Sequence, residues 1–192
     1  MTRTDGKEVS LAKRCEIANG IPGLNLFVSL HSNAAGSSGW SSASGWSEYI
    51  YGPGGDREKA AQDILAAVKA AGITVRSTPI VYDPGLYVLK HTVAPAVLLE
   101  QGFHTNQGDV ANLKDAAYRQ RLAEAEAKGI LTYLGIPWKE DTANTDFERA
   151  IQWVRENGIM LGNTDGDMML DQPVTRKQFA VMLYRYHEKF GR

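Results

Sequence analysis

The stretch LFVSLHSNA, residues 26–34, decides the expected fold of this chain. Its apolar start predicts a buried strand, which ends in a small polar loop that carries His31 and Asn33. A second stretch, PAVLLEQGFHTN at residues 95–106, repeats the pattern, because its apolar run ends in Glu100 before a Gly-Phe turn. Two buried strands that each end in one ionisable side chain are typical of an α/β protein with its site at the strand ends.

The segments around these two strands complete the α/β pattern. Helices are expected where apolar residues recur at helical spacing, over residues 9–19, 56–71, 109–113 and 118–134. Short extended segments are expected over residues 48–51, 73–76, 80–82 and 86–89. The expected fold is therefore α/β, with a partial mixed or parallel sheet flanked by helices.

The C-terminal part reads as a separate, small helical unit. Residues 137–144 are polar and predict a linker between a main domain at 1–136 and a unit at 145–192. Within that unit, Thr175 followed three residues later by Gln178 predicts a capping box at the start of a helix.

Composition excludes several classes of protein. The chain has 192 residues and a formal net charge of -1, so it lacks the basic footprint of a nucleic-acid-binding protein and a polybasic membrane patch. Cys15 is the single cysteine, which excludes an internal disulfide and a cysteine-rich zinc site. No apolar run reaches the length of a membrane span, and residues 1–10 lack the apolar core of a signal peptide.

Three blocks of sequence in this order resemble a known enzyme family. TRTDGKEVSLAKRCEIAN at residues 2–19, LFVSLHSNA and PAVLLEQGFHTN are similar to the zinc-dependent N-acetylmuramoyl-L-alanine amidases called amidase 3. The resemblance covers roughly the first two-thirds of the chain. It implies a peptidoglycan hydrolase that cuts the amide between N-acetylmuramic acid and L-alanine. It also implies action outside the cell or in the cell wall, as a secreted autolysin or a phage endolysin.

The resemblance also implies roles for individual residues. His31 matches a zinc ligand, and Glu100 matches the catalytic glutamate that takes a proton from water and passes it to the leaving amine. Zinc would lower the pKa of that water and polarise the carbonyl. Two further candidates do not come from the resemblance: Asn33 could orient His31 and contact the substrate, and His104, which matches no family ligand, could point at the substrate or at nothing.

A segment rich in glycine and serine, residues 35–47, carries two tryptophans and reads as an exposed loop. Trp40 and Trp46 are candidates for stacking on the sugar rings of the glycan. The alternative is that they cover the edge of the sheet.

The matched blocks begin at residue 2, whereas a family member has an earlier portion with a Gly-His-Gly-type motif and a glutamate. That histidine and that glutamate are zinc ligands in the family. We therefore expect an N-terminally truncated amidase domain that keeps one zinc ligand of three, binds zinc poorly and is inactive alone. The same reasoning predicts an uncovered strand edge, with low stability or association as its consequence.

Residues 153–183, WVRENGIMLGNTDGDMMLDQPVTRKQFAVML, resemble one S-layer homology repeat. Such repeats bind wall polymers, so the resemblance implies a secondary wall polymer as a partner in addition to peptidoglycan. The alternative is a helical hairpin that only packs on the main domain.

Two other functions compete with the amidase. One is a catalytically dead wall-binding module that uses the tryptophan loop and the C-terminal repeat. The other is a zinc-dependent peptidase of the same sheet type, which the flanking motifs fit less well.

Overall fold

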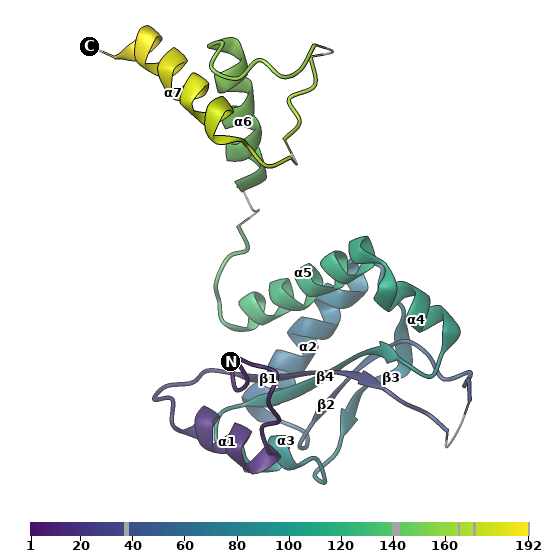
Figure 1. Cartoon of the computed structure of the whole chain (residues 1–192). Helices are drawn as coiled ribbons and strands as arrows, with labels where there is room; N and C mark the ends of the chain where they lie inside the picture. Colours follow the sequence, from purple (N-terminus) through teal and green to yellow (C-terminus); the bar gives the residue numbers. More distant parts are fainter. Residues whose placement is uncertain (37–38, 140–142, 165, 171, 192) are drawn as a thin grey trace. The chain divides into compact units, whose positions relative to one another are not determined.

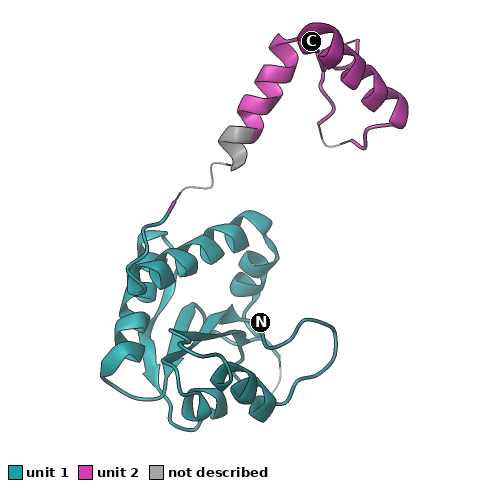
Figure 2. Ribbon diagram, turned by 90° about the vertical axis from the view of Figure 1, so that its left-hand side faces the viewer, with its two compact units in different colours: residues 1–138 teal, residues 139–192 magenta. Residues whose placement is uncertain are grey.

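The structure is a computed structural model that describes residues 1–36, 39–139, 143–164, 166–170 and 172–191 (Figure 1). The chain divides into two compact units, Met1–Trp138 and Lys139–Arg192 (Figure 2). No helix within the described ranges is long and apolar enough to cross a membrane.

A four-stranded sheet forms the centre of the first unit. Its strands are β1 (Phe27–Asn33), β4 (Ala96–Phe103), β2 (Trp46–Ile50) and β3 (Val75–Tyr82), in the spatial order β1-β4-β2-β3. The β1–β4 and β2–β3 pairs are parallel, whereas β2 runs antiparallel to β4. The sheet is therefore mixed, and the expected α/β class is confirmed.

Helices cover both faces of this sheet (Figure 1). On one face, α1 (Leu11–Asn19) and α3 (Tyr87–His91) pack against the strands. On the other face lie α2 (Gly55–Ala70) and α5 (Ala116–Tyr133), and α4 (Gln107–Lys114) connects β4 to α5. Parallel strands that are covered on both faces read as continuous apolar runs, which explains why the sequence signal at these strands is strong.

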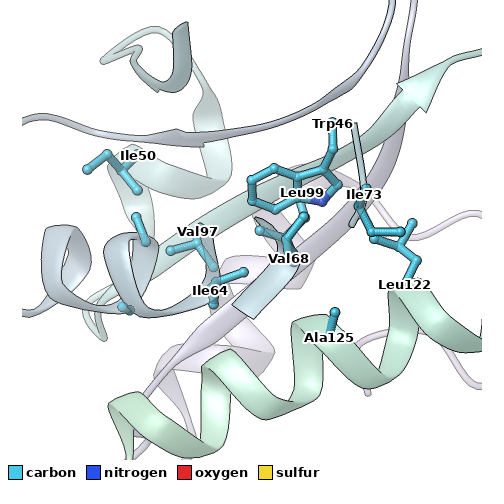
Figure 3. Close-up of a cluster of buried hydrophobic side chains, with 11 residues drawn as sticks. Trp46, Ile50, Ile64, Val68, Ile73, Val97, Leu99, Leu122 and Ala125 are labelled. Carbon is cyan, nitrogen blue, oxygen red and sulfur yellow. The ribbon is translucent and has the colours of Figure 1, made fainter. Parts of the chain in front are cut away.

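The central strand β4 alternates between the two faces. Val97 and Leu99 belong to the core under α2 and α5, which Figure 3 shows, whereas Ala96 and Leu98 pack against α1 and α3. Successive side chains of a strand point to opposite faces, so the next position, Glu100, lies on the face of α1 and α3. This alternation fixes where the polar end of the strand points.

The helices α2 and α5 approach each other closely at one glycine. A Cβ atom added to Gly129 would lie 2.4 Å from Cα of Ile64. Any side chain there would separate the two helices, because real Cβ atoms do not approach backbone atoms that closely. Gly129 therefore sets the spacing of the layer that covers the main core.

Three local expectations were wrong. Residues 86–89, expected as a strand, begin the helix α3, in which Val88 and Leu89 are both buried. A one-turn helix can bury two consecutive side chains on one face, whereas a strand would turn one of them away. Residues 75–76 and 80–82, expected in two separate extended segments, are extended but belong to one strand, β3. His31 lies within β1 and not in a loop after it, because β1 extends to Asn33.

Strand β1 forms one edge of the sheet. Its residue Leu30 is 61% exposed although it is apolar. An edge strand without charged residues offers unpaired backbone groups to other chains. The expected low stability or association stays a prediction.

In its described residues the second unit has two helices, α6 (Ala143–Glu156) and α7 (Arg176–Phe190). The capping box is confirmed, because the Thr175 hydroxyl accepts from N–H of Gln178 and the Gln178 side chain accepts from N–H of Thr175. The Trp153 ring stacks on the Phe190 ring with centroids 5.4 Å apart. This ring contact joins α6 to α7.

A carboxyl group is buried inside the main core. Glu48 lies between Trp46 and Ile50 on the face of β2 that packs against α2 and α5, and it is 0% exposed. Neither of its carboxyl oxygens has a hydrogen-bond partner among the described residues. Burial, and secondarily the charge of Glu126, raises the pKa of Glu48 to about 9. Glu48 is therefore a neutral acid at pH 7.

We expect Glu48→Gln to stabilise the protein in a pH-dependent way. The unfolded chain ionises Glu48 near 4.5, whereas the folded protein keeps it protonated to about 9, so the free energy of unfolding falls as pH rises between these values. Glutamine cannot ionise, so the variant should gain about 2–3 kcal/mol at pH 7 and almost nothing at pH 4.5. Urea denaturation at several pH values measures the difference. The exposed substitution Glu8→Gln is the control, and an equal gain at every pH would contradict the prediction.

Candidate active site

The pairing of β1 with β4 brings the two main candidate residues together. His31 and Glu100 are partners in the parallel register of these strands. Glu100 also faces Ser47 of β2 across the antiparallel pair. Partners on neighbouring strands project from the same face of a sheet. His31, Glu100 and Ser47 therefore form a row across three adjacent strands, on the face of α1 and α3.

Glu100 has the electrostatic properties of an acid–base group. It is partly buried, and its Oε2 atom is buried without a hydrogen-bond partner among the described residues. Burial raises the pKa of Glu100 to about 7, because a carboxylate loses hydration there. Near neutral pH the group is therefore present in both forms, and it can accept a proton and later return it.

His31 is exposed and has one polar neighbour on its own strand. Its Nε2 atom lies 3.0 Å from Oγ of Ser29, two residues earlier on the same face of β1. An exposed imidazole at the rim of the row is accessible to a ligand. This position fits the expected role of His31 as a metal ligand, which stays a prediction.

Sequence reasoning missed Ser47. The residue is 0% exposed, and its hydroxyl has no hydrogen-bond partner within the described parts of the chain. As the register partner of Glu100, it offers a free donor beside an unpartnered carboxyl oxygen. The sequence predicted that this strand begins at Glu48. Had the predicted strand begun at Trp46, the alternation of side chains would have placed Ser47 on the same face of the sheet as Glu100.

The side chain of Asn33 does not orient His31. Its amide nitrogen donates to the Tyr49 hydroxyl at 3.4 Å, and its amide oxygen accepts from N–H of Ala34 at 2.8 Å. The expected hydrogen bond to His31 is replaced by these local contacts. Asn33 lies at the end of β1, two residues beyond His31, and its proposed contact with substrate stays a prediction.

His104 follows the end of β4 and lies beside β1. Its N–H donates to the carbonyl of Asn33 at 2.9 Å, and its Nδ1 atom lies 3.2 Å from Oγ of Ser32. The structure thus holds His104 next to the strand that carries His31. Its expected contact with substrate stays a prediction.

The two tryptophans have different positions. Trp40 is 62% exposed and lies outside the helices and strands, which suits contact with a glycan. Trp46 is not in an exposed loop, so that expectation was wrong. It begins β2, it is 1% exposed, and its indole N–H donates to Glu126 at 2.9 Å (Figure 3 shows the ring against Leu99). A ring enclosed by the core has no free face for a sugar.

The described residues do not by themselves make a complete zinc site. They contain no group of three or more histidine, cysteine, aspartate or glutamate side chains that could hold a metal ion. His31 and Glu100 supply one imidazole and one carboxyl group at the row. A catalytic zinc ion usually needs three protein ligands, so this donor set is incomplete.

Asp109 anchors the two segments that flank the row. Its Oδ2 atom accepts from N–H of Gly45 at 2.9 Å and from N–H of Phe103 at 2.8 Å. The first bond fixes the entry to β2, and the second fixes the end of β4 just after Glu100. Gly102, at φ +132°, permits the backbone bend that brings Phe103 to this carboxylate.

Comparison with known proteins gives consistent matches. The Amidase 3 family model, described as N-acetylmuramoyl-L-alanine amidase, matches residues 1–132. N-acetylmuramoyl-L-alanine amidase CwlM of Bacillus licheniformis is 32% identical over 132 residues, which are 68% of this chain and 48% of that protein. The probable cell wall amidase LytH of Staphylococcus aureus is 34% identical over 138 residues, which are 69% of this chain and 41% of that protein.

A solved structure agrees with these matches. The catalytic domain of CwlV, an N-acetylmuramoyl-L-alanine amidase from Bacillus (Paenibacillus) polymyxa var. colistinus, has 32% identity and a TM-score of 0.61. The match covers 71% of this chain and 72% of that domain. The chain thus covers most of that domain, but it spans about half or less of the curated relatives CwlM and LytH.

We expect Asp109→Ala to loosen the site and destabilise the first unit. The change leaves two backbone N–H groups without their acceptor, at a cost of about 2 kcal/mol. Thermal unfolding and faster amide hydrogen exchange at Gly45 and Phe103 would report it. Asp109→Asn keeps an oxygen acceptor and should lose less. Equal stability of the alanine variant and the native protein would show that the anchor is unimportant.

Proposed function

This chain belongs to the Amidase 3 family of N-acetylmuramoyl-L-alanine amidases, and we propose that it acts on peptidoglycan through Glu100. The proposed reaction is hydrolysis of the amide between N-acetylmuramic acid and L-alanine. The observation that carries the proposal is the register pairing of His31 with Glu100, whose pKa is raised to about 7. An acid–base group with a pKa near the working pH is the most effective kind.

Glu100 can perform the two proton transfers that amide hydrolysis requires. In the first, its carboxylate accepts a proton from the attacking water, which then adds to the carbonyl carbon. In the second, the protonated Glu100 donates to the leaving nitrogen, and the C–N bond breaks to free the amino group of alanine. Oε2 of Glu100 is buried and has no hydrogen-bond partner among the described residues, so burial, and not a bound donor, sets the proton affinity of this carboxyl group.

Zinc is the cofactor that we propose for this reaction, with His31 as one ligand. The incomplete donor set at the row supports a further point, that His31 alone holds the metal weakly. The likeness to zinc amidases noted in the sequence supports the choice of metal. A complete site would need ligands beyond His31, and the described residues do not gather them.

We expect the 192-residue chain to bind zinc more weakly than micromolar. A single imidazole provides one of the three protein ligands that a catalytic zinc site usually has. Calorimetric titration with zinc measures the affinity. His31→Ala should abolish the remaining binding at the row, whereas His187→Ala in the second unit should not. Stoichiometric sub-micromolar binding by the native chain would contradict this expectation.

The amidase proposal itself is tested by adding protein ligands for zinc to the one that His31 would provide. A hybrid protein would combine this chain with the part of the CwlV catalytic domain that the chain does not match. The segments would follow one another in the same order as in that domain. With zinc, the hybrid should release new alanine amino groups from purified peptidoglycan. Glu100→Gln in the hybrid should lower the rate by about 10²–10⁴-fold, because acid–base catalysis is lost.

Two controls make this test conclusive. The hybrid with Glu124→Gln, a partly exposed position on α5 away from the row, should keep full activity. Zinc binding and the folded state of the hybrid would be verified before the assay. A folded, zinc-loaded hybrid that releases no alanine amino groups, or one whose rate is unaffected by Glu100→Gln, would refute the assignment of Glu100.

The alternative is a wall-binding module without activity. The exposed Trp40 favours it, because an exposed indole face can stack on a sugar ring. Binding of the folded hybrid to peptidoglycan without release of amino groups would support this alternative. The cell wall as the place of action follows from the peptidoglycan substrate that we propose. Action as a phage endolysin or as a secreted autolysin, and a secondary wall polymer as partner, remain predictions.

A further inference from the structure

The unit at residues 139–192 exposes most of its apolar side chains. Four of these side chains lie on one face of α7, at spacings of four, three and four residues: Phe179, Leu183, Tyr186 and Phe190 are between 42% and 54% exposed. This spacing is that of a seam between packed helices. We call these four residues, together with Trp153 of α6, the α7 seam.

The partner helix α6 covers this seam at one end only. Trp153 stacks on Phe190 and lies 6.4 Å from the ring of Tyr186, so these contacts involve the C-terminal half of α7. Figure 2 shows the two helices meeting at an angle and not lying side by side along their length. Phe179 and Leu183, at the other end, remain more than half exposed.

The unit has too little core to be stable by itself. Within its described residues, Ile159 and Met168 are the apolar side chains that are buried. Units this small usually gain stability from disulfides, metals or association. The single cysteine, Cys15, lies in the other unit, so no disulfide contributes. The described residues of the unit also gather no three histidine, cysteine, aspartate or glutamate side chains that could hold a metal ion, so association is the means that fits.

The size of the seam matches a dimer interface. Five half-exposed large side chains offer about 100 Å² each, or roughly 500 Å² of apolar surface. A standard interface buries about 800 Å² per partner, of which about 60% is apolar. Two seams packed together would therefore cover each other's exposed apolar surface without a third partner.

The first unit offers no comparable apolar strip within its described residues. Its exposed large apolar side chains lie on separate elements, for example Leu11 on α1, Leu30 on β1 and Tyr82 on β3. The α7 seam extends over 11 residue steps, or about 16 Å of helix. Isolated side chains on different elements do not fill a seam of that length.

We propose that residues 139–192 are a self-association module, in which the α7 seam of one chain packs on the α7 seam of a second copy. The dimer holds two copies of the first unit on one assembly. Two tethered copies bind a repetitive surface such as a cell wall with higher avidity than one copy. The association itself does not depend on amidase activity.

Sedimentation equilibrium of the full 192-residue chain tests the proposal. We expect a mass of twice 21.0 kDa that dissociates on dilution. The double variant Phe179→Glu and Leu183→Glu should sediment as a monomer, because it places four carboxylates in the paired seam. Tyr184→Glu, which changes a 63% exposed residue on another face of α7, should still form the dimer. Circular dichroism of each variant verifies that the helices are intact.

Other outcomes would overturn the proposal. If the native chain is a monomer at all concentrations, self-association is excluded. The same holds if that monomer binds wall polymer. A dimer that survives the double variant but dissociates on Leu30→Lys would place the contact at the edge strand β1. A dimer lost equally with Tyr184→Glu would show that the seam is not the interface.

Discussion

The parallel pairing of β1 with β4 is the constraint on which the site depends. Residues 27–31 of β1 are matched one to one with residues 96–100 of β4. The apolar part of this register is fixed by burial, because a slip of one residue would turn Leu98 and Phe27 out of the core they share. The same register then places His31 beside Glu100. The site is thus aligned by the hydrophobic core below it and needs no contact between its own polar groups.

Three carboxyl groups that are buried or partly buried lie on the two sides of the sheet, and their surroundings differ. Glu126 accepts hydrogen bonds from Trp46 and Gln101, which offset part of its burial, although burial still raises its pKa. Glu48 lies on the same side and has no such bond among the described residues, and it remains neutral instead. Glu100 lies on the opposite face, where burial is partial. Partial burial leaves its pKa close to neutrality, which proton transfer requires, whereas full burial would hold the proton too firmly.

The sequence predicted the class of fold and the main pair of the site because both depend on repeated patterns. Buried strands such as residues 96–99 give long apolar runs, and the ionisable residue at the end of each run is visible directly. The misplacement of Trp46 has a different cause. The glycines and serines before it are typical of a loop, but its indole is buried by α5 and bonded to Glu126, which is 80 residues away. Ser47 and Asp109 were missed for a similar reason, since their partners come from other segments of the chain.

The two units differ in how far they cover their apolar side chains. In the first, the close approach of α2 and α5 at Gly129 seals a core of side chains that are almost fully buried. In the second, the aromatic rings of Trp153 and Phe190 stack and yet stay more than 40% exposed. Apolar surface of this extent gains free energy only when it is covered, at about 25 cal/mol per Å². In the proposed dimer, the core that aligns the candidate site lies in residues 1–138 and the associating surface lies in residues 139–192, so the two are separated along the sequence. Association can then vary with concentration while the register of β1 and β4 stays the same.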